Sequence, residues 1–275
     1  MAMLIDYHIH NHFSPDSNDH TREIAERALE LGIEEIAITN HMQTEDPEKH
    51  IDIFSLEEAI PRLNAAKKEI EETQLHFPQL RILFGIEVDS NLPWKKDADL
   101  LVRQLDLDIA LGSVHIVDDV IISSPRRAIE FYQHVSEEHA YSRYFELMQD
   151  FTRDGNFDVV AHFDVCKRGG TEIYGAFNPQ KYKPLILSSL QNIKNRGLGI
   201  ELNTGSMHRR CNEIYPHPDI IKWALEIGVE HFTLGSDSHH PDVIGCNFQE
   251  AIQIAKELGI TKFTRYQKRN PISLP

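Results

Sequence analysis

Short apolar runs typical of β-strands alternate with amphipathic segments typical of helices along the whole chain. The first helix is predicted to begin at Thr21, where an N-cap precedes an acidic first turn, and to end before Gly32. Further helices are predicted near residues 56–73, 94–105, 136–153, 179–196, 219–227 and 247–258, with strands between them and a last strand near Phe263. This alternation predicts a parallel sheet covered by helices.

Six of the predicted strands end in a histidine or a carboxylate. The side chains at these ends are His8 and His10, His41, Glu87, His115, His162, and Asp237 with His239. The carboxyl ends of parallel strands share one edge, and only a closed barrel brings six of them around a common centre. An open, doubly wound sheet would instead collect its polar residues at one crevice. We therefore predict an α/β barrel of about seven or eight strands, with residues 1–275 as one domain.

The composition limits which binding partners and which cellular compartment we expect. The formal net charge is -15, from 43 acidic and 28 basic residues, which argues against nucleic acid as the partner. The three cysteines form no CxxC pair, so neither a disulfide framework nor a thiolate zinc site is predicted. The sequence has no secretory signal, no apolar run long enough to span a bilayer and no glycine-rich nucleotide loop. A cytoplasmic protein that does not bind membranes is expected, and its oligomeric state is open.

Metal binding is the chemistry that the strand ends indicate. His8 and His10 are two residues apart, so in a strand they point the same way and can hold one ion between them. The same spacing relates Asp237 and His239. Glu87 follows an apolar run, where a lone carboxylate is costly to bury unless it is paired or binds metal. Its two oxygens can bridge two ions.

His115 and His162 each end a strongly apolar stretch and are further candidate ligands. Asp164, two residues beyond His162, is interpreted as a partner that orients an imidazole. The remaining histidines are assigned to solvent or packing: His12, His20, His50, His76, His134, His139, His217 and His231.

Phosphate chemistry also needs cationic side chains near the substrate. Two basic pairs are predicted to lie in loops that follow strands, Lys167-Arg168 and Arg209-Arg210, and His208 adjoins the second pair. Arginine is the better phosphate ligand, because it binds in a bidentate manner. Two long irregular stretches, residues 42–54 and 116–136, are predicted to cover the active face.

Six ordered motifs resemble those of the PHP (polymerase and histidinol phosphatase) superfamily. They are His8-Ile9-His10, Thr39-Asn40-His41, Gly85-Ile86-Glu87, Gly112-Ser113-Val114-His115, Ala161-His162-Phe163-Asp164 and Gly235-Ser236-Asp237-Ser238-His239. The resemblance spans residues 4 to 240. It implies a distorted (β/α)7 TIM-like barrel and two or three divalent ions of zinc, manganese or iron.

The resemblance also implies how the ligands are shared. His8, His10, Glu87 and Asp237 would hold the first ion, and Glu87 would bridge to a second ion on His115 and His162. The third ion would bind His41, His239 and a residue in the loop after the first strand. In many relatives that residue is a histidine, whereas the matching position here is Asp16.

Within the superfamily, weaker motifs such as Glu201-Leu202-Asn203-Thr204 resemble the monofunctional histidinol-phosphate phosphatases of histidine biosynthesis. This implies hydrolysis of L-histidinol phosphate to L-histidinol and inorganic phosphate, with Arg168, Arg209 or Arg210 holding the phosphate and His208 assisting. A hydroxide that bridges two ions would attack phosphorus. Asp237, His239 or a metal-bound water would protonate the leaving oxygen, and the sequence does not choose among them.

Three alternatives stay open: a PHP phosphoesterase acting on another small ester, a metal-dependent amidohydrolase, and a metal-stabilised binding module without turnover. Glu87 on the third strand favours the PHP pattern over the amidohydrolase pattern, which has its bridging residue on a middle strand.

Overall fold

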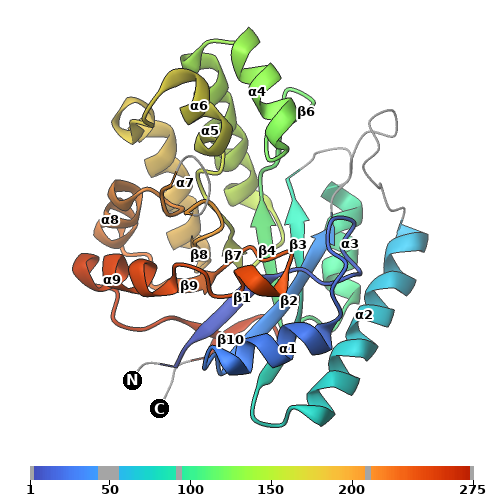
Figure 1. Ribbon diagram of the computed structural model, residues 1–275. Coiled ribbons are helices and arrows are strands. Elements are labelled where there is room, and N and C mark those ends of the chain that lie inside the picture. Colours follow the sequence, from blue (N-terminus) through green and yellow to red (C-terminus); the bar gives the residue numbers. More distant parts are fainter. Residues whose placement is uncertain (1–2, 43–55, 91–94, 208–211, 273–275) are drawn as a thin grey trace.

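Seven parallel strands form the centre of the computed structural model, which describes residues 3–42, 56–90, 95–207 and 212–272 (Figure 1). The strands follow one another around the sheet in chain order: β1 (Ile5–Ile9), β2 (Glu35–Met42), β3 (Arg81–Asp89), β4 (Ile109–Ser113), β7 (Val159–Val160), β8 (Gly199–Asn203) and β9 (His231–Gly235). Backbone hydrogen bonds join the two edges, because His10 N–H donates to Ser238 O at 2.8 Å and Ser238 N–H donates to His8 O at 3.2 Å. The predicted (β/α)7 barrel is therefore confirmed.

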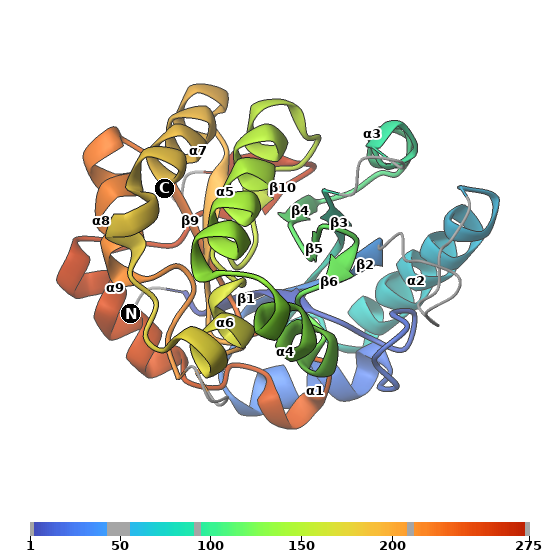
Figure 2. The same ribbon diagram turned by 90° about the horizontal axis from the view of Figure 1, so that it is seen from above.

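The barrel is distorted at two places. The pairing of β1 with β2 changes register between Asp6 and Ile9, and β7 contains only two residues. Helices surround the strands, as Figure 2 shows from above. They are α1 (Thr21–Glu30), α2 (Leu56–His76), α3 (Lys95–Gln104), α4 (Pro125–His134), α5 (Glu137–Asp154), α6 (Lys167–Tyr174), α7 (Lys183–Arg196), α8 (Pro218–Ile227) and α9 (Phe248–Leu258). None of the helices in the described part of the chain is long and apolar enough to cross a membrane.

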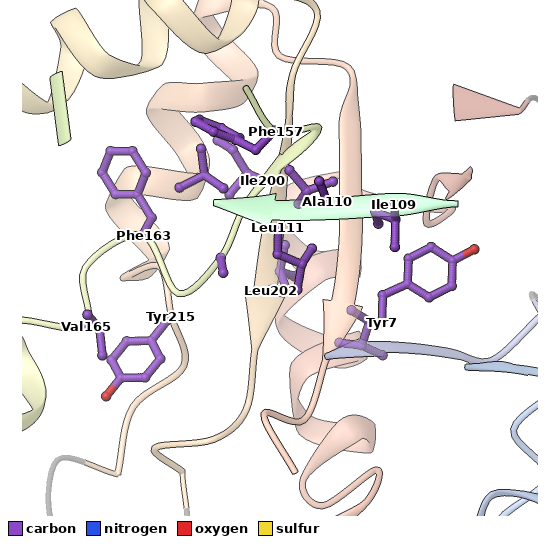
Figure 3. Packing of buried hydrophobic residues seen from close by; sticks show 14 of the residues in the cluster. Tyr7, Ile109, Ala110, Leu111, Phe157, Phe163, Val165, Ile200, Leu202 and Tyr215 are labelled. Carbon is purple, nitrogen blue, oxygen red and sulfur yellow. The ribbon is translucent and has the colours of Figure 1, made fainter. Parts of the chain in front are cut away.

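The strands are buried on both faces, which explains why they are almost continuously apolar in sequence. Side chains on β4 and β8, such as Leu111, Ile200 and Leu202, are fully buried in the core (Figure 3). Polar residues interrupt the runs mainly near the carboxyl ends of the strands. This pattern gathers many of the polar side chains of the strands at one end of the barrel.

The opposite end of the barrel contains a buried ion pair centred on Glu35 of β2. The carboxylate of Glu35 accepts hydrogen bonds from Tyr7 Oη, from Arg81 Nη1 at 2.9 Å and from Arg265 Nε at 2.9 Å. Arg265 begins β10 (Arg265–Gln267), which pairs with β11 (Asn270–Ile272) in an antiparallel hairpin. The last predicted strand therefore forms a separate hairpin rather than part of the barrel.

The segment 116–136 is more ordered than the predicted irregular stretch. It contains a short hairpin of β5 (Ile116–Val117) and β6 (Val120–Ile121), followed by α4. The two hairpin-turn residues, Asp118 and Asp119, have φ of 48° and 62°, a conformation that glycine often adopts in such turns. Because neither residue is glycine, the usual sequence signal for this turn is missing. The other predicted irregular stretch lies largely outside the described residues.

Helix α6 occupies a region that was predicted as loop. Two adjacent glycines, which normally disfavour a helix, hide it in the sequence. A Cβ on Gly170 would lie 2.1 Å from the Tyr141 hydroxyl oxygen, so close packing against α5 requires glycine there. Tertiary packing has overridden local propensity.

We expect Glu35→Gln to lower the free energy of unfolding by about 2–3 kcal/mol. Removing one partner of a fully buried ion pair costs about 3–5 kcal/mol, and the cost is smaller here because Arg81 and Arg265 keep part of their solvent contact. Urea denaturation of both proteins at equal metal loading measures the difference. The exposed neighbour Glu34 provides the control, since Glu34→Gln is expected to change stability by less than about 0.5 kcal/mol.

Candidate metal centre

All nine side chains predicted as metal ligands lie together at the carboxyl end of the barrel strands. His8, His41 and Glu87 belong to β1, β2 and β3, while the others follow strands or lie in the loop between β1 and α1: His10, Asp16, His115, His162, Asp237 and His239. Two of them have unusual backbones, since φ is 23° at His162 and 54° at Asp237. Such conformations cost of order 1–3 kcal/mol and cluster at functional sites.

One oxygen of Glu87 faces the histidines that follow β4 and β7. Glu87 Oε1 lies 2.9 Å from His162 Nε2 and 3.4 Å from His115 Nε2. The two imidazole nitrogens are themselves 3.2 Å apart, and the Ser113 hydroxyl donates to the same carboxylate oxygen. Glu87, His115 and His162 thus form a compact group that offers two nitrogen atoms and one oxygen atom as possible metal ligands.

The other oxygen of Glu87 faces the histidines of β1 and β2. Glu87 Oε2 lies 2.7 Å from His41 Nδ1, 3.2 Å from His8 Nε2 and 3.7 Å from His10 Nε2. Asp237 Oδ1 completes this side, at 3.6 Å from His8 Nε2 and 3.5 Å from His10 Nε2. The carboxylate thus stands between two sets of nitrogen ligands, one on each oxygen.

A third group lies nearer the surface. Asp16 Oδ2 is 3.0 Å from His239 Nε2 and 3.4 Å from His41 Nε2, and the two imidazole nitrogens are 3.3 Å apart. Half of the Asp16 side chain is exposed, whereas Glu87 is fully buried. Asp16 therefore stands where the sequence resemblance placed a ligand, at the open edge of the centre.

These side chains fit a set of divalent cations. His10, His41 and His239 form one group, His8, His10 and Glu87 a second, and Glu87, His115 and His162 a third, each with its ligand atoms within 4.8 Å of one another. His8 Nε2 and His10 Nε2 are buried without a hydrogen-bond partner, and such atoms are costly unless they bind something. Mixed imidazole and carboxylate sites suit zinc, manganese and iron.

The charges of the site shift its pKa values in opposite directions. Burial opposes the charged form of His8, but the carboxylates of Glu201 and Glu87 outweigh it and raise the pKa well above 6.5. Burial and the neighbouring His239 and His41 lower the pKa of His10, so this imidazole is neutral and ready to bind a cation. Burial alone would raise the pKa of Glu87, yet the surrounding histidines lower it and keep the carboxylate ionised.

Comparison with known proteins establishes the family. The sequence profile of the PHP domain matches residues 6–205. The chain belongs to the PHP domain family. Among PHP relatives, a protein named probable histidinol-phosphatase from Deinococcus radiodurans is 27% identical over 98% of this chain and all of its own length. The histidinol-phosphatase of Lactococcus lactis is 23% identical, over 95% of this chain and 94% of its own.

A solved structure shares the PHP fold of this chain along nearly its whole length. It is the histidinol phosphate phosphatase of Lactococcus lactis, complexed with zinc, L-histidinol and phosphate. The TM-score is 0.86 at 22% sequence identity, and the alignment covers 98% of this chain and 99% of that protein.

Two carboxylates that the sequence analysis did not assign to the site hold its histidines in place. Glu201 Oε1 lies 2.8 Å from His8 Nδ1, and Glu201 Oε2 accepts a hydrogen bond from His162 N–H at 2.9 Å. Asp89 Oδ2 lies 2.9 Å from His115 Nδ1. Each carboxylate contacts the ring nitrogen that points away from Glu87, and so orients the imidazole.

The positions of Asp89 and Glu201 in the sequence could have indicated their roles. Asp89 is two residues after Glu87 on the same strand, and Glu201 interrupts the apolar strand β8. A Cβ on Gly235 would lie 2.0 Å from Glu201 Oε1 and 2.7 Å from His8 Cβ. Glycine in β9 is therefore what leaves room for this pair.

The basic residues considered for phosphate binding differ in their burial and in their partners. Lys167 is fully buried, its ammonium donates to Ile214 O at 2.7 Å, and it lies 3.1 Å from Asp164 Oδ2. It is committed to these partners and is not available to a phosphate. Asp164 also accepts from His217 N–H at 2.9 Å, so it anchors backbone rather than the imidazole that was predicted.

Arg168 is half-buried and lies in the first turn of α6, not in the predicted loop. Among the residues that the structure describes, no carboxylate pairs with its guanidinium. His208, Arg209 and Arg210 lie outside the described residues.

We expect Glu201→Gln to weaken zinc binding about 10- to 100-fold while the barrel stays folded. The reason is that an amide cannot match a carboxylate in orienting His8, and loss of such an outer partner typically has this effect. Competition with a chromophoric chelator measures the affinity. The exposed Glu226 of α8 supplies the control: if Glu226→Gln and Glu201→Gln bind zinc as tightly as the wild type, Glu201 has no orienting role.

Proposed function

We propose that this PHP protein is a metal-dependent phosphomonoesterase that hydrolyses L-histidinol phosphate to L-histidinol and inorganic phosphate. The observation that carries the proposal is the position of Glu87, whose two oxygens face two separate groups of histidines. Such an arrangement suits a pair of bridged ions, which is a common basis for phosphate ester hydrolysis. Relatives named histidinol-phosphatase, which align over nearly the full chain, support the choice of substrate.

The proposed ligand sets combine the groups of closely spaced ligand atoms with the contacts of Asp16 and Asp237. His8, His10, Glu87 and Asp237 would hold one ion, Glu87, His115 and His162 a second, and Asp16, His41 and His239 a third. Bound divalent ions supply a nucleophile by acidifying water and neutralise charge on the phosphate. Zinc, manganese and iron all fit these donors.

The chain's own groups divide the remaining work. The pKa of Asp237 is lowered, because His8 and His10 outweigh the effect of burial, so its carboxylate is ionised, as a metal ligand must be. His239, with about a quarter of its side chain exposed at the rim, is proposed to hold the third ion through Nε2 while its Nδ1–H donates to Asp237 O at 3.1 Å, and the leaving oxygen would take its proton from water at this open edge. Glu201 and Asp89 keep the imidazoles oriented while this occurs.

Release of phosphate from L-histidinol phosphate tests the function directly. We expect a chelator to abolish the activity and zinc, manganese or iron to restore it. Glu87→Gln should lose at least about 10²- to 10³-fold in kcat, because both groups of ligands share this carboxylate. His134→Ala is the matched control, since His134 is exposed on α4 and should leave activity unchanged.

The possible outcomes test the reaction class and the identity of the substrate separately. Turnover of other phosphomonoesters without turnover of L-histidinol phosphate would keep the reaction class and refute the substrate. Cleavage of a cyclic amide or lactone instead of any phosphoester would favour an amidohydrolase, and inertness of the fully metal-loaded protein would favour a binding module.

Arg168 is our proposed phosphate ligand, because it is half-buried in the first turn of α6, six residues after the proposed metal ligand His162. We expect Arg168→Ala to lower kcat/KM about 10- to 100-fold, the effect of losing charge-assisted hydrogen bonds worth about 1.5–3 kcal/mol. Steady-state kinetics with L-histidinol phosphate measures this. Arg143→Ala, on the exposed face of α5, is the control. If Arg209→Ala or Arg210→Ala alone shows the loss, the phosphate ligand lies in that segment instead.

A further inference from the structure

A second cluster of histidine and carboxylate side chains lies outside the strand-end centre. His12 and His20 come from the two ends of the loop between β1 and α1, and Glu69 comes from the middle of α2. Glu69 Oε2 lies 2.7 Å from His12 Nε2 and 3.4 Å from His20 Nδ1, and the two imidazole rings are 4.1 Å apart. Both histidines were assigned to solvent or packing from the sequence, and their side chains are 27% exposed at His12 and 62% exposed at His20.

The carboxylate of Glu69 is held in a fixed orientation. Its Oε1 accepts hydrogen bonds from Thr21 N–H at 2.9 Å and from Thr21 Oγ1 at 2.8 Å, which leaves Oε2 for the two imidazoles. Burial raises the pKa of Glu69, but the hydrogen bonds from Thr21 and His12 outweigh it and keep the group ionised. A carboxylate oriented by other hydrogen bonds is the arrangement found around bound metals.

The loop that carries the two histidines is also preorganised. His12 N–H donates to Asp19 O at 2.8 Å, and Asn11 Nδ2 donates to Thr21 Oγ1 at 3.0 Å. These bonds close the loop and bring His12 and His20 together without the help of Glu69. The three ligand atoms therefore need little ordering to meet one ion.

The spacing of the ligand atoms suits a tetrahedral cation. The three atoms lie within 4.8 Å of one another. Zinc bonds of about 2.0–2.1 Å place tetrahedral ligands roughly 3.3 Å apart, and the two distances from Glu69 Oε2 bracket that value. The His20 side chain is 62% exposed, so the fourth position is open to water.

We propose that His12, His20 and Glu69 form a separate binding site for a divalent ion of the zinc class. Two imidazoles and one carboxylate with an open position are an established zinc ligand set. The site shares no residue with the three groups of the strand-end centre. An ion here joins the β1–α1 loop to α2, and so restrains the loop that contains Asp16, which lies between His12 and His20 in the chain.

Counting bound zinc in matched variants tests the site. Wild type and His20→Ala are equilibrated at the same buffered free zinc concentrations, and bound zinc per chain is measured by elemental analysis and native mass spectrometry. We expect His20→Ala to bind one zinc ion fewer at saturation. His76→Ala is the control, because His76 is exposed on the same helix as Glu69 and contacts only backbone, at Glu72 O.

Equal zinc counts in wild type and His20→Ala would overturn the proposal. His12→Asn provides a second variant with the same expected loss, and circular dichroism checks that each variant is folded. Anomalous diffraction at the zinc edge locates the ion: a peak among His12, His20 and Glu69 supports the site, and peaks confined to the strand ends refute it. None of these measurements depends on turnover, so a protein inactive on every phosphate ester can still show the site.

Discussion

The buried carboxylate of Glu87 is the constraint on which the rest of the site depends. A fully buried, ionised carboxylate costs several kcal/mol unless opposite charge or a cation surrounds it. Five histidines meet this need, three facing one oxygen and two facing the other. They come from β1 and its end, from β2 and from the ends of β4 and β7, which lie on either side of β3 in the parallel sheet. The environment that Glu87 needs therefore depends on the arrangement of the barrel strands.

Support for the centre extends beyond the side chains that face Glu87. Glu201 contacts both the ring of His8 and the backbone of His162, and it fits only because residue 235 is glycine. At the other end of the barrel, Glu35 joins β2 to β3 and to the C-terminal hairpin through Arg81 and Arg265. One buried carboxylate therefore organises each end.

The alternation of strands and helices, the barrel and the nine converging side chains could all be predicted, because they depend on local patterns and on period-two geometry. The errors have specific physical causes. Helix α6 is hidden by Gly169 and Gly170, which the close approach of Tyr141 requires. Lys167 looked like a phosphate ligand, yet it is buried against Asp164 and Ile214. A sequence shows that a residue is charged but not which partner already neutralises it.

The sequence by itself determined which residues stand at the strand ends, and hence the family and the prediction of metal binding. That information is local, because an apolar run and the residue that ends it are neighbours in the chain. Only the tertiary structure decided which oxygen of Glu87 faces which histidine, that Glu201 and Asp89 orient His8 and His115, and that His12 and His20 meet Glu69. The residues in these contacts are between 26 positions apart, for Asp89 and His115, and 193 positions apart, for His8 and Glu201. Only the packing of the folded chain brings them within hydrogen-bonding distance.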